Sequence, residues 1–218
     1  MFSQCDIYLN GVLITSSTNT YGYRSFIETI LSHGQDVKYT RLASCLYFKD
    51  KAGKMDSIEI AGADVNQGFM DRRALAATSN VLDMMGRLHA DIFFQDRYIL
   101  PGVNIKIRLT RAKDEFCLMG VNARTVKIIS AKLLVRKVRI APSVELGHAR
   151  ALEINSAKYP IRRVVCKSFT VPRGLRDINQ EKLVSGQLSQ RLVIGLVDNE
   201  NFIGAIGRIP FNFAASRK

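Results

Sequence analysis

Apolar and polar residues alternate along several parts of the chain, which is the pattern of strands with one buried face. Two short apolar runs surround Asn10-Gly11, a pair that supplies the two positive φ angles of a type I′ turn and so predicts a tight hairpin. The run at 103–109 has the cleanest one-sided pattern, and its Lys106, Arg108 and Thr110 are expected to face solvent or a partner. Similar runs, alternating or rich in β-branched residues, predict further strands at 88–94, 125–140, 161–171 and 192–197.

Apolar residues recur at helical spacing in two places. From 23 to 31 they fall at i, i+3, i+4, i+7 and i+8, which predicts a helix with Thr20 as its cap and Gly34 as its stop. The spacing from 144 to 152 predicts a second helix of about three turns, for which Ser143 offers an N-cap. This second helix separates two of the predicted strands.

The order of these elements indicates the fold class. Hairpin, helix, loop, strands, short helix and strands follow one another without the strand–helix alternation of a parallel sheet. Residues 50–67 are expected to form an exposed loop, and 69–77 stays open between a helix and an arm. We therefore expect a mainly β fold, an antiparallel jelly-roll β-sandwich with short helices inserted in its loops. The length of 218 residues favours a single domain over 1–218.

Positive charge is concentrated in one part of the chain. The net charge is +13, and residues 132–176 contribute +9 of it, from 11 basic and 2 acidic side chains. Such a segment is typical of a solvated or assembly surface, or of a nucleic-acid-binding module. Cations in one continuous groove would favour nucleic acid, whereas cations dispersed around a rim would favour assembly. The candidate subunit or nucleic-acid contacts are Arg136, Lys137, Arg139, Arg162, Arg163 and Lys167.

No motif in the sequence indicates catalysis or a bound cofactor. The four cysteines are scattered singly and no histidine has metal-ligand spacing, so we expect neither a metal site nor a cofactor. Glycine-rich phosphate loops and the nucleophile-elbow motif are also missing. The sequence thus predicts a non-enzymatic protein without a small-molecule substrate, and a sugar-binding role has only the fold class in its favour.

The chain shows no targeting or membrane signal. No apolar run approaches the roughly 18 residues that span a bilayer, and the first residues lack the apolar core of a secretory signal. Single cysteines suit a reducing compartment. We expect a cytoplasmic, nuclear or virion-type protein that is neither secreted nor bound to a membrane.

Several short motifs resemble one known family when they are taken together and in order. The resemblance covers the chain from about Phe2 to Phe213, and the family is the double jelly-roll major capsid proteins of Polinton (Maverick) elements and adintovirus-like viruses. The motifs are Leu9-Asn10-Gly11, Ser17-Thr18-Asn19-Thr20-Tyr21, residues 86–95, Val135-Arg136-Lys137-Val138, Tyr159-Pro160-Ile161-Arg162-Arg163, Val197-Asp198-Asn199 and Asn212-Phe213.

The resemblance implies a structural role without catalysis. Subunits of that family carry two jelly rolls side by side and form pseudo-hexagonal trimers that tile an icosahedral shell, so self-association as a trimer is expected. Compared with them, the chain lacks the first strands and the second jelly roll, and we expect a partial first barrel from a capsid subunit or from an integrated or domesticated fragment of one. Sheet edges left unpaired in this way are expected to invite pairing with another chain.

Overall fold

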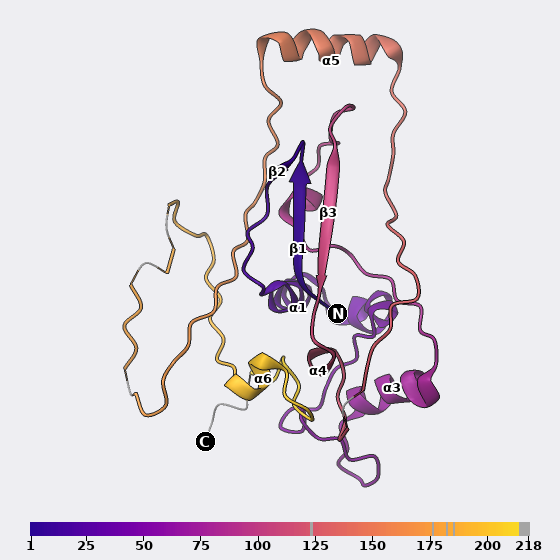
Figure 1. The fold of residues 1–218 in the computed structure, drawn as a ribbon, viewed down its shortest axis with the longest axis vertical. Helices are drawn as coiled ribbons and strands as arrows, with labels where there is room; N and C mark the ends of the chain where they lie inside the picture. Colours follow the sequence, from indigo (N-terminus) through magenta and orange to yellow (C-terminus); the bar gives the residue numbers. More distant parts are fainter. Residues whose placement is uncertain (123, 176, 182, 185, 214–218) are drawn as a thin grey trace.

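The chain folds into a small sheet, several helices and long connecting segments (Figure 1). The computed structural model describes residues 1–122, 124–175, 177–181, 183–184 and 186–213. In chain order the strands and helices are β1 (Phe2–Leu9), β2 (Val12–Leu13), α1 (Tyr21–Ser32), α2 (Gln35–Tyr39), η1 (Arg41–Cys45), α3 (Gln67–Ala76), η2 (Ala77–Ser79), η3 (Asp91–Phe94), β3 (Ile105–Arg111), α4 (Asp114–Cys117), α5 (Pro142–Ile154) and α6 (Asn199–Ile203), where η marks a 3-10 helix.

The sheet has three antiparallel strands in the order β2-β1-β3. Asn10 and Gly11 both have positive φ, 48° and 83°, so the predicted hairpin between β1 and β2 is confirmed together with its turn. The central strand β1 then pairs with β3, with Ile7 opposite Ile107. The predicted strand at 103–109 is confirmed as β3, and its outer edge has no neighbouring strand among the described residues.

The two predicted helices form, with small differences at their ends. Helix α1 begins at Tyr21 after Thr20, and it ends before His33, whose extended backbone (φ −122°, ψ 133°) stops the helix one residue ahead of Gly34. Helix α5 begins one residue before the predicted cap, because Pro142 occupies its first turn, where a missing N–H costs no hydrogen bond. The segment 69–77, left open by the sequence, lies mostly within helix α3.

One buried cluster lies between the sheet and the segment before β3. Its members Cys5, Ile7, Ala90 and Ile92 are at most 4% exposed, and Ile7 is completely buried. Ile161 packs against this cluster from a distant part of the sequence. The buried members of this cluster all come from β1 and from the segment before β3.

Aromatic rings form a second packed region against the N-terminal half of α1. The rings of Phe26 and Phe211 stack with centroids 4.2 Å apart, and those of Tyr23 and Phe202 stack at 5.3 Å. Phe116 meets Tyr23 edge to face at 6.0 Å. Offset stacks and edge-to-face pairs are the favoured aromatic geometries. This packing joins α6 and the residues after it to α1.

The predicted jelly-roll β-sandwich is wrong. About 29% of the described residues are helical and about 8% are in strands, and these residues contain a single three-stranded sheet. The predicted strands at 125–140, 161–171 and 192–197 belong to no ladder, and part of the predicted strand 88–94 is the 3-10 helix η3. Alternating apolar and polar residues show only that the side chains suit a pleated strand. A segment becomes part of a sheet only when a neighbouring strand pairs with it. The described residues provide that neighbour only for β1, β2 and β3.

Residues 127–172 form an arm. The chain runs away from α4 through residues 127–141, which we call the outward leg, and comes back through residues 155–172, the return leg. Helix α5 connects the two legs beyond the end of the sheet, and the legs stand on either side of the sheet in Figure 1. Every residue of α5 is exposed.

Candidate functional site

The outward leg carries three of the predicted contact residues. Arg136, Lys137 and Arg139 are all exposed. At the start of the leg, the Val126 N–H donates to Asp114 Oδ1 over 3.2 Å, and Arg111 donates to the Val126 carbonyl. Beyond that point no hydrogen bond links residues 127–140 to any other described residue. Among the described residues, the outward leg is therefore hydrogen-bonded to the rest of the protein at its base and continues directly into α5.

The return leg carries the other three residues and is attached to the rest of the protein. The Val164 N–H donates to Asp91 Oδ1 over 3.3 Å, and Thr20 Oγ1 donates to the Cys166 carbonyl over 3.1 Å. Arg97 Nη1 also donates to the Lys158 carbonyl over 2.7 Å. Arg162 and Arg163 are exposed between these attachments. Lys167 Nζ donates to the carbonyl of Leu183 over 3.1 Å.

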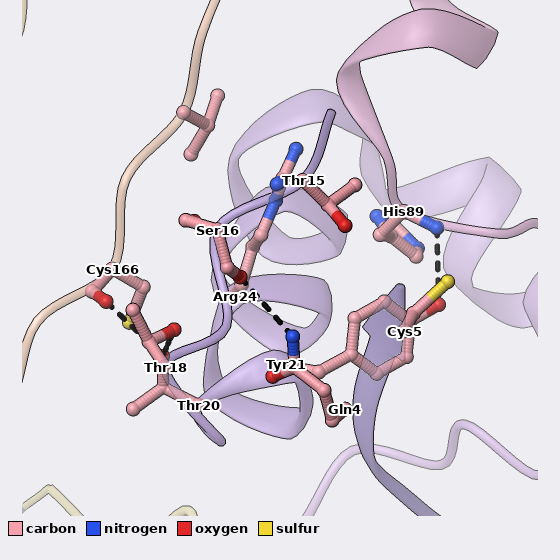
Figure 2. Close-up of a pocket in the computed structure, with 11 residues that line it drawn as sticks. Gln4, Cys5, Thr15, Ser16, Thr18, Thr20, Tyr21, Arg24, His89 and Cys166 are labelled. Carbon is pink, nitrogen blue, oxygen red and sulfur yellow. Dashed lines mark hydrogen bonds between the residues drawn. The ribbon is translucent and has the colours of Figure 1, made fainter. Parts of the chain in front are cut away.

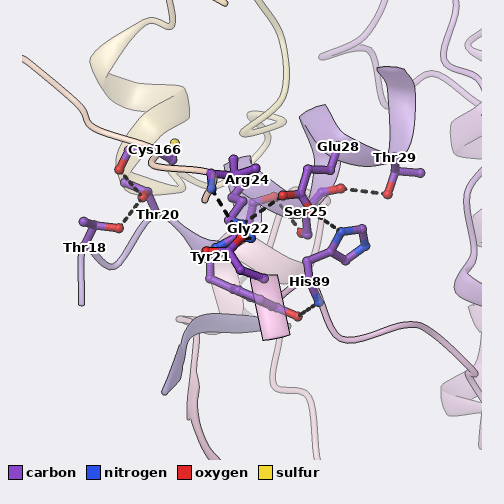
Figure 3. A network of polar contacts seen from close by, with 12 residues as sticks. Thr18, Thr20, Tyr21, Gly22, Arg24, Ser25, Glu28, Thr29, His89 and Cys166 are labelled. Atoms are coloured by element: carbon purple, nitrogen blue, oxygen red, sulfur yellow. Dashed lines mark hydrogen bonds and ion pairs between the residues drawn. The ribbon is translucent and has the colours of Figure 1, made fainter. Parts of the chain in front are cut away.

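A network of charged side chains, which includes Arg24, Glu28 and His89 (Figure 3), supports the attachment at Asp91. Arg24 of α1 pairs with Asp91 and also with Glu28, at 3.0 Å, and His89 Nδ1 lies 2.7 Å from the second oxygen of Glu28. Burial by itself raises the pKa of Glu28, but the hydrogen bond with His89 and the nearby Arg24 outweigh burial and lower that pKa below its ordinary value. Glu28 is therefore ionised at neutral pH.

A small polar hollow lies where the hairpin, α1 and the return leg meet (Figure 2). Burial raises the pKa of the Cys5 thiol to about 11 and that of the Tyr21 hydroxyl to about 12. Both groups are thus protonated at neutral pH, so neither is an activated nucleophile in this hollow. Thr20 and Arg24, which also line the hollow, are already bonded to Cys166 and to the two carboxylates.

Within the ranges that the structure describes, no group of three or more His, Cys, Asp and Glu side chains could hold a metal ion. No helix among these residues has the length and apolar character required to cross a membrane.

The structure does not gather the six predicted cations into one groove. Arg136, Lys137 and Arg139 lie on the outward leg, whereas the other three lie on the return leg, and the sheet stands between the two legs (Figure 1). Arg176, the last residue of the basic segment, lies outside the described residues. The positive charge is therefore divided between two separate surfaces.

Exposed apolar side chains occur along the same segments. Ile129 is 70% exposed and Leu134 74% on the outward leg, and Ile194 is 76% exposed in the run 192–197. Val165 and Phe169 of the return leg are about half exposed. These segments have the composition of buried strands, yet many of their apolar side chains are exposed and their backbone groups form no strand ladder among the described residues.

Sequence reasoning missed the polar anchor of the C-terminal region. Asp56 lies in the segment that was predicted to be an exposed loop, but its carboxylate accepts hydrogen bonds from the Ile209 N–H (2.8 Å) and from Asn212 Nδ2 (2.7 Å). The same segment contains Asn66, which is completely buried and donates to Asp50 over 2.9 Å. The polarity of 50–67 gives no sign of the contacts of Asp56, because their partners Ile209 and Asn212 are distant in sequence.

Comparison with known proteins gives one relative. No model of a known protein family matches the chain, and no solved structure matches it. The chain is 25% identical over 213 residues to an uncharacterized protein of Caenorhabditis elegans. The match covers 95% of this chain and 48% of the relative, so the chain spans about half the length of the curated relative that it matches.

Proposed function

We propose that the protein is a non-catalytic structural subunit of the capsid type, which associates with further copies of itself. The observation that carries this proposal is the exposure of strand-like apolar segments, above all the outward leg, whose side chains and backbone have no partner among the described residues. Unpaired strand-like backbone is a template for pairing with another chain.

The exposed apolar side chains give such an association its driving force. Removing one Leu, Ile or Val side chain from water contributes about 1.5–3 kcal/mol. The outward leg alone exposes six large apolar side chains, so a modest fraction of this surface is enough to offset the cost of association. The exposed residues of this leg are Ile128, Ile129, Leu133, Leu134, Val135 and Val138.

The distribution of charge supports assembly ahead of nucleic-acid binding. A nucleic-acid groove needs cations that follow one continuous path. The six predicted cations are divided between two legs on either side of the sheet, which suits contacts with neighbouring subunits. The resemblance to capsid subunits, drawn from the order of the sequence motifs, supports the same structural role independently of the barrel topology.

Light scattering coupled to size-exclusion chromatography tests the proposal. We expect trimers or larger species whose population grows with concentration. Leu134→Glu should reduce association, because it places a charge on the apolar surface of the outward leg. Val81→Glu is the matched control, since Val81 is 78% exposed and lies outside the arm. A folded monomer at every concentration, or equal effects of the two variants, would contradict the proposal.

A further inference from the structure

The outer edge of β3 is a site for an added strand. The sheet order β2-β1-β3 leaves β3 with a neighbour on one side only, so the backbone groups on its other side have no ladder partner among the described residues. β3 has seven residues, of which Lys106, Arg108 and Arg111 are basic and none is acidic. A strand that pairs with this edge must therefore be compatible with three positive charges.

The strand-like segments of the chain differ in the charge that each would bring to the edge of β3. The outward leg contains five basic side chains and the return leg contains three within 161–171, and neither run contains an acidic one. Like charges on neighbouring strands are destabilising. The run 192–197 contains no charge; Arg191 precedes it, and Asp198 and Glu200 follow it. It is therefore the run that places no positive charge of its own beside β3, and its C-terminal end carries acidic side chains.

The run 192–197 is also held in place and open to a partner. A Cβ at Gly195 would lie 3.1 Å from the ring of Phe213, so the backbone of the run passes close against this ring. Helix α6, which follows the run, packs Phe202 on Tyr23 with ring centroids 5.3 Å apart. Ile194 is nevertheless 76% exposed. One part of the run is thus fixed to the body while its exposed part is free for pairing.

Within one chain, the run 192–197 and the free edge of β3 lie on opposite sides of the sheet. In Figure 1 the residues leading into α6 lie on the β2 side of the sheet, whereas the unpaired edge of β3 faces the opposite way, and β1 stands between them. Pairing inside one molecule would require the run to pass the whole sheet. A second copy can present the same run without any such rearrangement.

We propose that the run 192–197 of one copy adds as a strand to the free edge of β3 in a second copy. This inference rests on the proposed function, because it names the contact through which the copies associate. Such an interface joins two different surfaces, so its repetition closes a ring when the rotation allows it. The added strand extends the sheet by backbone hydrogen bonds, and Asp198 brings negative charge toward the cations of β3.

Disulfide trapping between two chains of different size tests the contact. In a Cys45→Ser background, one chain carries Lys106→Cys, Arg108→Cys or Thr110→Cys, and the other carries Val193→Cys or Ile194→Cys. Val193 and Ile194 are successive residues, so they lie on opposite faces of the run. Opposed residues of paired strands approach closely enough for a disulfide. The matched control replaces the second chain by Leu188→Cys, because Leu188 is 95% exposed and precedes the run.

We expect at least one combination to form the mixed disulfide about ten-fold more than the control, since pairing raises the local thiol concentration. Mixed disulfides no more abundant than the control, in a sample that light scattering shows to be associated, would overturn this inference and leave the proposed function standing. A monomeric sample would overturn both. A disulfide within one chain that carries both cysteines, formed in a monomer, would also overturn it.

A charge exchange gives a second measurement that does not depend on cysteines. Lys106→Glu should weaken association about two- to five-fold, the effect of one cross-strand charge pair. Adding Asp198→Lys in the partner chain should restore it. Asp198 makes no side-chain cap to α6, so this helix keeps its hydrogen bonds. Absence of both the weakening and the restoration would contradict the contact.

Discussion

The sheet and the arm both contain strand-like apolar segments, but these have opposite environments. β1 and the outward leg both carry large apolar side chains, yet Ile7 of β1 is completely buried whereas Leu134 of the leg is 74% exposed. The difference is the neighbour: β1 has a strand on each side, and the leg has none among the described residues. Side-chain composition therefore makes a segment able to be a strand, and pairing decides whether it becomes one.

The largest expected effect is on the free energy of unfolding, when one apolar side chain is truncated in each region. Ile7→Ala should lower the free energy of unfolding by about 2–5 kcal/mol, because it removes buried methyl groups and leaves a cavity. Leu134→Ala is the matched change in the outward leg and should alter it by no more than about 0.5 kcal/mol in a monomer. Urea denaturation of both variants measures the contrast. Equal losses would show that the leg is packed in solution.

A second prediction concerns the anchor of the C-terminal region. Asp56→Ala should lower the free energy of unfolding by about 1–3 kcal/mol, because it removes the acceptor of two part-buried hydrogen bonds, from the Ile209 N–H and from Asn212 Nδ2. Asp64→Ala is the control, since Asp64 is a largely exposed carboxylate paired with Lys51. Limited proteolysis should cut residues 199–213 faster only in Asp56→Ala. Identical cleavage in both variants would argue against the anchor.

A third prediction uses the charged network that attaches the return leg. The pKa of Glu28 is lower in the folded protein than in the unfolded chain, so its contribution to stability is complete above the unfolded value and is lost as the pH falls through the folded value. Stability should therefore decrease from about pH 5 to about pH 3 more steeply in the natural protein than in Glu28→Gln. Unfolding free energies at these pH values give the comparison, and parallel curves would contradict it.

The smallest expected effect concerns the cations of the arm. Arg136→Glu combined with Lys137→Glu should change the free energy of unfolding of the monomer by less than about 0.5 kcal/mol, because both side chains are exposed. If the legs contact subunits and not nucleic acid, DNA binding should be weak and equal in the variant and the natural protein. Affinity that falls steeply between about 50 and 200 mM salt, and is lost in the variant, would favour the nucleic-acid alternative.

Local elements of the fold were accessible from the sequence. The hairpin at Asn10-Gly11 follows from the φ preferences of two residues, and α1 follows from one apolar face, so both depend on neighbours only a few positions apart. β3 was also predicted, from its alternation. The same reasoning placed strands at 125–140 and 192–197, which have no neighbouring strand among the described residues, because alternation alone carries no information about pairing.

Long-range contacts account for what the sequence did not predict. The stack of Phe26 on Phe211 and the bonds from Asp56 to the C-terminal region join residues more than 150 positions apart. No spacing rule connects such residues. The six cations were identified as exposed charges, but their division between two legs follows from the position of α5 relative to the sheet.

Because β1 pairs with β3, the sheet cannot form during synthesis until β3 has also been made. Phe2 lies opposite Arg111, so the central strand leaves the ribosome long before its main partner has been made. At typical rates of about 5–20 residues per second, the interval lasts roughly 5–20 s. Contacts this distant also slow the folding of a completed chain. During the interval the buried side of β1, including Ile7, is open to other nascent chains, and a chaperone that shields the first strand should increase the yield of folded protein.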